Sequence, residues 1–283
     1  MIPAPFDYEV ADSVDHAIEM LSATPDAKVL AGGHSLIPLM KLRFARPSTL
    51  VDISRIGSLS YIREDGDRIA IGACTRHQDV HRSEVLESAC PMLSYAAGLI
   101  GDPQVRHRGT IGGAVSHGDP ASDLPTVLLA LDAQFVIRGP NNARRAIGAE
   151  DFFQGFLQTD LAPDEVLTEI RVPKLGSHIG WSYLKFNRRA QDWAIVGVAT
   201  LVRRTNGSIE EARIALGNMG SVPIRAIHSE AAIAGADRSG IPAAAAVAAE
   251  GTNPPSDTNG AADYRRALAQ VLVGRALEGA LGT

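Results

Sequence analysis

Two short glycine-rich segments contain the residues whose types and spacing best suit binding chemistry. The first, residues 28–35 (KVLAGGHS), is a strand-like run that ends in paired glycines followed by small polar residues. Because Gly32 and Gly33 have no Cβ, a phosphate can approach the backbone, and consecutive amides can form a concave anion site that the Ser35 hydroxyl assists. The alternative interpretation is a tight surface turn, the usual structure of an isolated glycine pair.

A second segment of similar composition lies at residues 108–116 (RGTIGGAVS), where Gly112 and Gly113 form the glycine pair. Two such turns in one chain can clamp a pyrophosphate from opposite sides. Neither fits the GxGxxG pattern of a nicotinamide-binding Rossmann domain or a Walker A loop, since no lysine follows the glycines and neither turn visibly opens a long helix. The pair therefore favours a nucleotide site outside the Rossmann fold.

An acidic residue follows the second glycine pair, within residues 119–125 (DPASDLP). Ser122 or Asp123 can cap the helix expected over 123–131. Asp123 can instead accept hydrogen bonds from the ribose or adenine of a nucleotide. The residues alone leave both roles open.

The elements around these segments predict an α+β fold. A helix capped by Ser13 connects strand-like runs into a βαβ-like unit, and a hairpin over 61–73 with its turn at 64–67 comes next. The remaining elements expected before Pro173 are a helical region at 76–100, a glycine-rich stretch at 109–118, a helix at 123–131 and a strand at 134–138.

The C-terminal third predicts a small sheet followed by helices. Asn206-Gly207 is a strong hairpin signal between two of its strands. The expected elements are strands at 181–189, 194–204 and 209–217, a helix from Pro223 to Gly235, and a last helix with Tyr264, Leu268, Val271 and Leu272 on one face.

Composition and charge exclude several classes of protein. The chain has 283 residues, of which 45% are hydrophobic and 21% charged, which is typical of globular proteins. The formal net charge of −5 provides no basic field for a nucleic acid. The N-terminus lacks a signal peptide, and no apolar run is long enough to span a membrane, so we expect a cytoplasmic protein.

The cysteines and histidines indicate no metal site. Cys74 and Cys90 are too few for a disulfide framework or for an iron–sulfur cluster held by this chain alone, and we expect buried, reduced thiols. The histidines, including His77, His81 and His117, form no helix-spaced pair with a carboxylate.

Four motifs, taken in order, resemble the FAD-binding subunit of the molybdenum hydroxylases, in particular the medium subunits of the carbon monoxide dehydrogenase group. These motifs are AGGHS at 31–35, RHRGTIGGA at 106–114, DPASDLP at 119–125 and KFNRRAQDWAIVGVA at 185–199. The resemblance implies a non-Rossmann FAD fold of the PCMH or vanillyl-alcohol-oxidase type. Two α/β lobes at 1–56 and 57–176 hold the cofactor, and a lobe at 177–283 has a three-stranded antiparallel sheet and helices.

The resemblance also implies a function and partners. In such enzymes a large subunit with the molybdenum cofactor oxidises the substrate, and a small subunit with two 2Fe-2S clusters carries the electrons. The flavin then passes them to an external acceptor such as a quinone, NAD or oxygen. This chain would bind non-covalent FAD in a complex of such subunits, arranged as a dimer of heterotrimers, and would contribute no acid–base residue or nucleophile of its own.

Carried over by position, the glycine segments bind the FAD pyrophosphate, Asp123 meets the nucleotide half, and Lys185 and Trp193 approach the isoalloxazine. A core tryptophan at a sheet edge is the alternative for Trp193, and a satisfied turn histidine is the alternative for His34. Relatives commonly have Asn or Ser at Ala114 and Asn at His107. The residues expected to contact FAD are Lys28, Val29, Leu30, Ala31, Gly32, Gly33, His34, Ser35, Ile100, Thr110, Ile111, Gly112, Gly113, Ala114, Asp123, Leu167, Lys185 and Trp193.

Two other functions fit parts of the pattern. A stand-alone flavin oxidase or dehydrogenase would act on its own substrate, but about 100 residues after the flavin lobes leave little room for a substrate domain. A scaffold subunit that has lost flavin is disfavoured because both glycine pairs are intact.

Overall fold

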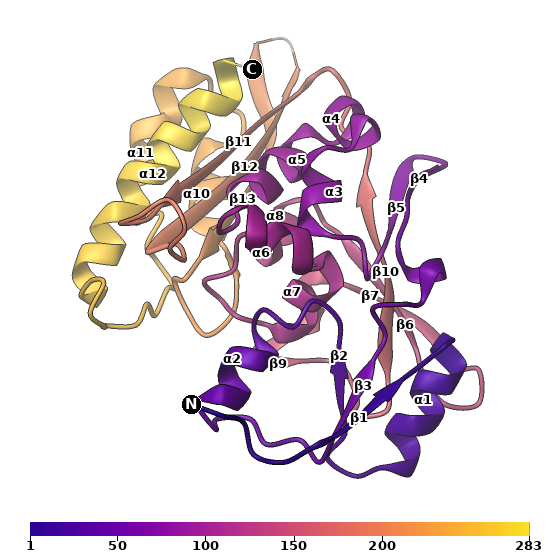
Figure 1. The fold of residues 1–283 in the computed structure, drawn as a ribbon. Coiled ribbons are helices and arrows are strands. Elements are labelled where there is room, and N and C mark those ends of the chain that lie inside the picture. The colour runs from indigo at the N-terminus through magenta and orange to yellow at the C-terminus, as the bar shows by residue number, and fades with distance from the viewer. Residues whose placement is uncertain (206, 283) are drawn as a thin grey trace.

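The computed structural model describes residues 1–205 and 207–282, and within these ranges the strands form four sheets. The N-terminal lobe, at the bottom of Figure 1, contains a parallel sheet in the order β1-β3-β2. Ser13 caps its first helix by accepting the His16 amide, and the apolar side of that helix is buried. The elements of this lobe are β1 (Asp7–Val10), α1 (Val14–Ala23), β2 (Lys28–Leu30), α2 (Leu36–Lys41) and β3 (Thr49–Asp52).

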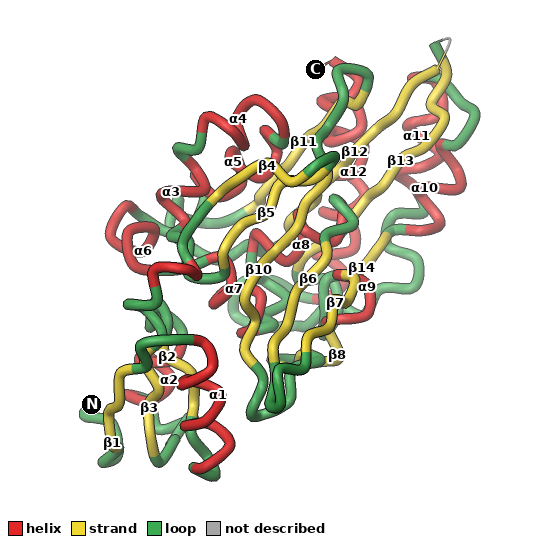
Figure 2. The backbone as a smooth tube through the Cα atoms, turned by 90° about the vertical axis from the view of Figure 1, so that its right-hand side faces the viewer, coloured by secondary structure: helices red, strands yellow, loops and turns green. Residues whose placement is uncertain are grey.

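A five-stranded antiparallel sheet forms the middle of the molecule, and Figure 2 shows its strands side by side. In spatial order the strands are β4 (Ile62–Asp65), β5 (Arg68–Gly72), β10 (Val166–Pro173), β6 (Gln134–Arg138) and β7 (Arg144–Gly148). The predicted hairpin at 61–73 is therefore confirmed as β4 and β5.

Short helices cover one face of this sheet and enclose the largest hydrophobic core. The region predicted as helical at 76–100 is divided among three of them, and the helix predicted at 123–131 is confirmed as α8. The helices are α3 (His77–His81), α4 (Glu84–Ala89), α5 (Pro91–Gly98), α6 (Pro103–Arg108), α7 (Ile111–His117) and α8 (Asp123–Ala130). The smaller elements are η1 (Gly57–Leu59), α9 (Ala149–Phe152), β8 (Phe153–Gly155) and β9 (Gln158–Thr159).

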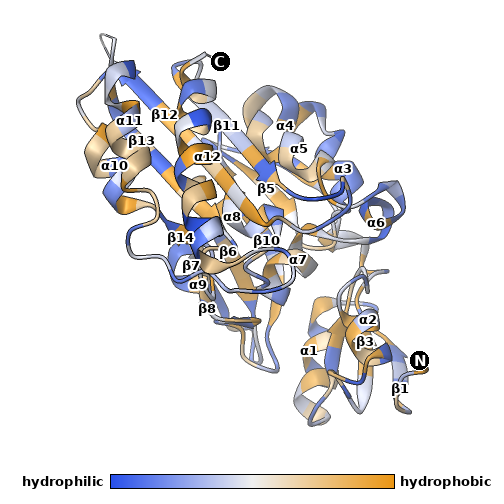
Figure 3. Ribbon diagram, turned by 90° about the vertical axis from the view of Figure 1, so that its left-hand side faces the viewer, coloured by the Kyte–Doolittle hydropathy of each residue, from blue (hydrophilic) through white to orange (hydrophobic). Residues whose placement is uncertain are grey.

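The C-terminal lobe is an antiparallel sheet that is covered on both faces. α12 packs against β11 and β12 from one side, and α8 of the middle lobe packs against β12 and β13. Strands that are buried on both sides carry long apolar runs, as β12 does, and Figure 3 shows the hydrophobic colour along the strands beside α12. The elements are β11 (Ile179–Phe186), β12 (Val196–Thr205), β13 (Ser208–Gly217), β14 (Ile224–Arg225), α10 (Ile227–Ile233), η2 (Arg238–Gly240), α11 (Ile241–Ala246) and α12 (Ala262–Gly282).

Two predictions for this lobe need correction. The sheet has a fourth strand, because Ile224 and Arg225 pair with β13, and the helix predicted from Pro223 therefore begins only at Ile227. The predicted hairpin turn falls on Asn206, which lies outside the described residues, whereas the adjoining Thr205 and Ser208 are paired.

The predicted apolar face of the last helix is correct for Leu268, which packs against the core, and for Leu272, which is buried, but wrong for the other two residues. Tyr264 and Val271 are about half exposed, at 48% and 49%. The buried side of α12 also contains Arg265, whose guanidinium donates to the Ile195 carbonyl and to Asp257. Its other buried residues are Ala269, Leu272, Val273, Ala276, Leu277, Ala280 and Leu281. The alanines allow the helix to lie close to the sheet, and the larger apolar side chains between them fill the core.

Candidate functional site

A cavity of about 850 Å³ lies where the N-terminal lobe meets the middle lobe. It extends from the end of β2, past α6 and α7, to the loop between β11 and β12. The predicted residues that line it are Lys28, Val29, Leu30, Ala31, Gly32, Gly33, His34, Ser35, Ile100, Thr110, Gly112, Gly113, Ala114, Asp123, Leu167 and Trp193. The fold thus brings both glycine segments and the distant Trp193 to one cavity.

The first glycine segment presents unpaired backbone donors to this cavity. Gly33 has a φ of +77°, a conformation that favours glycine. Among the described residues, the amides of Gly32, Gly33, His34 and Ser35 donate to no protein acceptor. Four adjacent free donors on residues that line a cavity fit the oxygens of a diphosphate.

The two glycine segments touch each other at Gly32 and Gly109. A Cβ on Gly32 would clash with the Arg108 carbonyl oxygen and would lie 2.8 Å from the Gly109 Cα. The Arg76 guanidinium also donates to that Arg108 carbonyl. Glycine at position 32 is therefore required for the close approach of the two lobes, in addition to any contact with a ligand.

The second segment differs from its prediction as a turn, because residues 111–117 form helix α7. Thr110 caps the helix by accepting the Gly113 amide at 3.0 Å, and Gly118 ends it with a φ of +65°. The Ile111 and Gly112 amides donate to the carbonyls of Thr75 and Ala73, and the Ala114 amide donates to the Thr110 carbonyl. The expected free main-chain donors at 111–114 are thus already used inside the protein.

Gly112 shows why this helix needs a glycine pair. A Cβ there would lie 2.5 Å from the Ala73 Cβ and 2.6 Å from the Ala73 carbonyl oxygen. Gly113 by contrast would meet only the Thr110 hydroxyl oxygen, at 2.7 Å. Gly112 allows the helix to pack closely on Ala73, and Gly113 leaves the side of the helix that lines the cavity open.

Asp123 and Lys185 form a buried ion pair at the cavity wall. Lys185 Nζ lies 2.9 Å from Asp123 Oδ2 and donates to the Leu99 carbonyl at 3.1 Å, while the Tyr183 hydroxyl donates to Asp123 Oδ1 at 2.6 Å. Both side chains of the pair are 5% exposed. Burial raises the pKa of Asp123, and the ammonium of Lys185 acts against this rise.

This geometry bears on three predicted roles. Ser122 is the N-cap residue of α8 but its side chain makes no cap hydrogen bond, and the Asp123 carboxylate accepts from Tyr183 and Lys185, so the capping alternative does not hold. Asp123 lines the cavity, whereas Lys185 does not, because its ammonium is turned toward Asp123 and Leu99. Ile111 is also absent from the wall, since its side chain is fully buried in the core.

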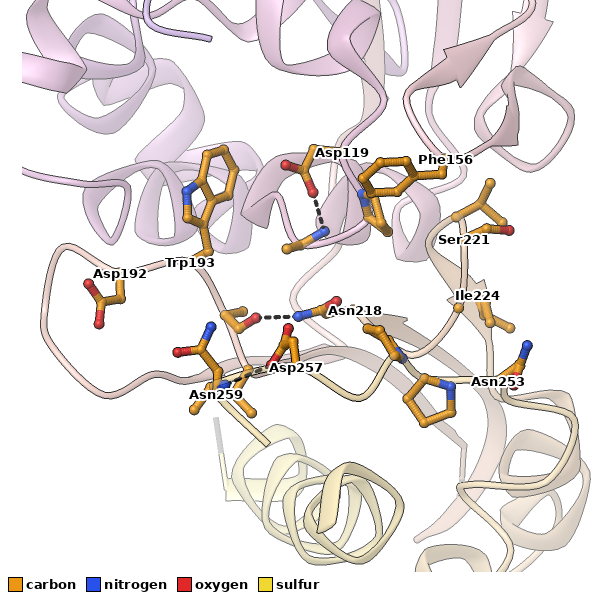
Figure 4. A pocket seen from close by; sticks show the side chains of 18 of the residues that line it. Asp119, Phe156, Asp192, Trp193, Asn218, Ser221, Ile224, Asn253, Asp257 and Asn259 are labelled. Atoms are coloured by element: carbon orange, nitrogen blue, oxygen red, sulfur yellow. Dashed lines mark hydrogen bonds between the residues drawn. The ribbon is translucent and has the colours of Figure 1, made fainter. Parts of the chain in front are cut away.

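Trp193 is an exposed side chain at the edge of the cavity. It is 54% exposed, so the alternative of a core tryptophan is wrong. Together with Asp192 it also lines a second cavity of about 970 Å³ between the middle and C-terminal lobes. In Figure 4, Trp193, Asp119 and Phe156 lie on one side of this second cavity, and Asp257 and Asn259 lie opposite.

Several residues of the first cavity were missed by the sequence analysis. His77 and His117 approach it from α3 and α7, and the loop between β9 and β10 contributes residues such as Leu161 and Pro163. No local motif marks these residues, because they reach the cavity only through the tertiary fold.

No group of three or more histidine, cysteine or acidic residues in the described part of the chain is arranged to hold a metal ion. Cys74 and Cys90 are buried free thiols, as predicted, and burial raises the pKa of Cys74 to about 11 and that of Cys90 to about 12. Over residues 1–205 and 207–282, no helix has both the length and the apolarity needed to cross a membrane.

Comparison with known proteins agrees with this geometry. Residues 4–175 match the family model of the FAD binding domain in molybdopterin dehydrogenase, and residues 181–280 match that of the CO dehydrogenase flavoprotein C-terminal domain. The chain is 43% identical to the carbon monoxide dehydrogenase medium chain of Hydrogenophaga pseudoflava, over 99% of this chain and 98% of that protein.

Two further proteins are similar over nearly their full length. The alpha subunit of the 6-hydroxypseudooxynicotine dehydrogenase complex of Paenarthrobacter nicotinovorans is 41% identical, over 99% of this chain and 96% of that protein. A solved carbon monoxide dehydrogenase from Hydrogenophaga pseudoflava, which lacks the Mo-pyranopterin moiety of its cofactor, matches with a TM-score of 0.97 and 45% identity. That match covers 100% of this chain and 99% of the solved one. The chain therefore belongs to the family of FAD-binding medium subunits of molybdenum hydroxylases.

Proposed function

We propose that this chain is the electron-transfer subunit of a cytoplasmic molybdenum hydroxylase, passing electrons from 2Fe-2S clusters through FAD to an external acceptor. The observation that carries the proposal is the row of free amides at Gly32, Gly33, His34 and Ser35 on the wall of the first cavity. When bound, FAD supplies redox chemistry that can take up electrons singly and release one or two. The chain itself binds and orients the cofactor.

We place FAD between the lobes at 1–56 and 57–176, with its diphosphate against the first glycine segment. Thr110 and Gly113 line the same cavity. The buried carboxylate of Asp123 is available to hydroxyl groups of the cofactor, while Lys185 holds that carboxylate in place. Trp193 then limits access to the end of the cavity that it lines.

The second cavity supports the proposal of an external acceptor, because it shares Trp193 and Asp192 with the first. Its lining includes the carboxylates of Asp119, Asp192 and Asp257, and its arginine, Arg188, lies 3.8 Å from Asp192. Asp192 and Asp257 are each paired with an arginine, Arg188 and Arg265, so the lining carries little unpaired negative charge. The acceptor in this proposal is a quinone, NAD or oxygen.

The partners in this proposal are a small iron–sulfur subunit and a large molybdenum-cofactor subunit, assembled as a dimer of heterotrimers. The similarity to a protein named as a medium chain and to a subunit of a dehydrogenase complex supports such an assembly. The third lobe, 177–283, is a sheet closed on both faces by helices, which leaves little of it for a substrate domain.

Copurification of the native complex tests this function. The expected result is one FAD per copy of this chain, with two partner chains that hold molybdenum and iron. Substrate should reduce the flavin in the complex, and the FAD-loaded chain alone should not react with it. Turnover of that substrate by the isolated chain would instead favour a stand-alone flavin dehydrogenase, and a colourless complex would favour a scaffold.

A further inference from the structure

His77 is a residue of the first cavity that the binding scheme above leaves unused. It is the first residue of α3, is 5% exposed and lines the cavity. Its backbone amide donates to the Gly109 carbonyl at 3.0 Å. The backbone of His77 is therefore fixed next to the point where the two glycine segments touch.

The two ring nitrogens of His77 have different surroundings. Nδ1 is closed off from solvent and has no hydrogen-bond partner among the described residues, whereas Nε2 is not closed off. The Nε2 edge faces Gly109, since a Cβ on that glycine would lie 2.7 Å from Cδ2 and 3.0 Å from Nε2 of the ring. Gly109 in turn contacts Gly32, so this edge points to the junction of the two lobes.

The charge state of the ring follows from its burial. Burial lowers the pKa of His77 to about 4, and the neighbouring His34, Arg76 and Arg106 act in the same direction. A neutral imidazole carries one N–H. If that proton were on Nδ1, a buried donor would have no acceptor, and the lone pair of Nε2 would face a bound anion. A proton on Nε2 avoids both of these unfavourable arrangements.

We propose that His77 is held as the Nε2–H tautomer and donates a hydrogen bond from Nε2 to a phosphate oxygen of the bound dinucleotide. This inference rests on the placement of the diphosphate against the first glycine segment. It gives the middle lobe a donor to the diphosphate in place of the α7 amides, which are already bonded inside the protein.

The test uses the purified complex, freed of flavin and titrated with FAD, ADP and riboflavin. His77→Gln keeps an N–H donor near the position of Nε2, and His77→Asn keeps one only near the position of Nδ1. We expect His77→Asn to lower the affinity for FAD and for ADP by about 10-fold, which corresponds to the loss of one hydrogen bond to a charged group. His77→Gln should stay within about 3-fold of the unchanged protein, and riboflavin, which has no phosphate, should bind equally to all three.

Two results would overturn this role. Equal FAD affinity in His77→Asn and the unchanged protein would leave the ring as packing only. An equal loss for FAD and riboflavin in both variants would mean that the ring shapes the cavity without contacting phosphate. Failure of the unchanged complex to bind FAD would count against the proposed function itself, and is thus distinguishable from both.

Discussion

The two glycine segments look alike in sequence but do different work in the structure. Residues 32–35 follow an edge strand and keep their amides free, whereas residues 111–114 begin a helix and have their amides bonded within the protein. In the first segment glycine allows a left-handed turn whose amides stay free, and in the second it lets α7 pack on Ala73. A glycine pair thus indicates that another group comes close to the backbone. The fold decides whether that group is a ligand or another part of the protein.

The largest expected effect separates ligand binding from folding in the first segment. Gly33→Asp places a negative side chain beside the free amides at a φ of +77°, and we expect at least a 100-fold loss of FAD affinity. FAD content per chain, read from visible absorbance, measures it. Gly66→Asp is the matched control, because Gly66 has a φ of +64°, sits in the β4–β5 turn and has open space around it. Full FAD occupancy in Gly33→Asp would contradict the placement of the diphosphate.

The next largest effect is expected from disrupting the contact between the two glycine segments. Gly32→Ala forces a methyl group against the Arg108 carbonyl and the Gly109 Cα, and we expect a loss of about 1–3 kcal/mol in stability together with weaker FAD binding. Thermal unfolding of the FAD-free protein and an FAD titration measure the two effects. Gly57→Ala has no atom within 4 Å of the new Cβ and should change neither. An unchanged melting temperature in Gly32→Ala would show that the lobes do not need this close approach.

The pH dependence of stability tests the burial of His77 between the segments. Its folded pKa of about 4 lies below the ordinary value of 6.5, so the unfolded state takes up a proton first as the pH falls. Stability of the FAD-free protein should therefore decrease from pH 6.5 toward pH 4, by on the order of 3 kcal/mol from this group. Denaturant unfolding at a series of pH values measures the slope. An equally steep slope in His77→Gln would assign it to other groups.

The smallest effect concerns the cap of the second segment. Thr110→Ala removes the acceptor of the Gly113 amide, and we expect a loss of about 1 kcal/mol in stability. Thr110→Ser restores a hydroxyl and should recover most of it, as read from thermal unfolding. If neither variant changes the stability, the hydrogen bond from the Gly113 amide to Thr110 does not stabilise α7, and the proposed difference between the two segments is weakened.

The sequence allowed the fold class, the hairpin at 61–73 and the strands around β12 to be predicted, because periodicity and turn residues are local signals. Through the four motifs it also indicated the part of the cavity lining that comes from both glycine segments, Asp123 and Trp193. The helix at Ile111–His117 was missed, since its two glycines disfavour helices locally and its stability comes from the Thr110 cap and the contact with Ala73. The pairing of Lys185 with Asp123 joins residues 62 positions apart, and no local pattern predicts such a contact.

Amide hydrogen–deuterium exchange of the complex with and without FAD tests most directly the claim that the two segments differ. We predict that the amides of residues 32–35 exchange rapidly without FAD and become protected when it binds. The amides of residues 111–114 should be protected in both states. Protection that appears on FAD binding at 111–114 but not at 32–35 would contradict the account.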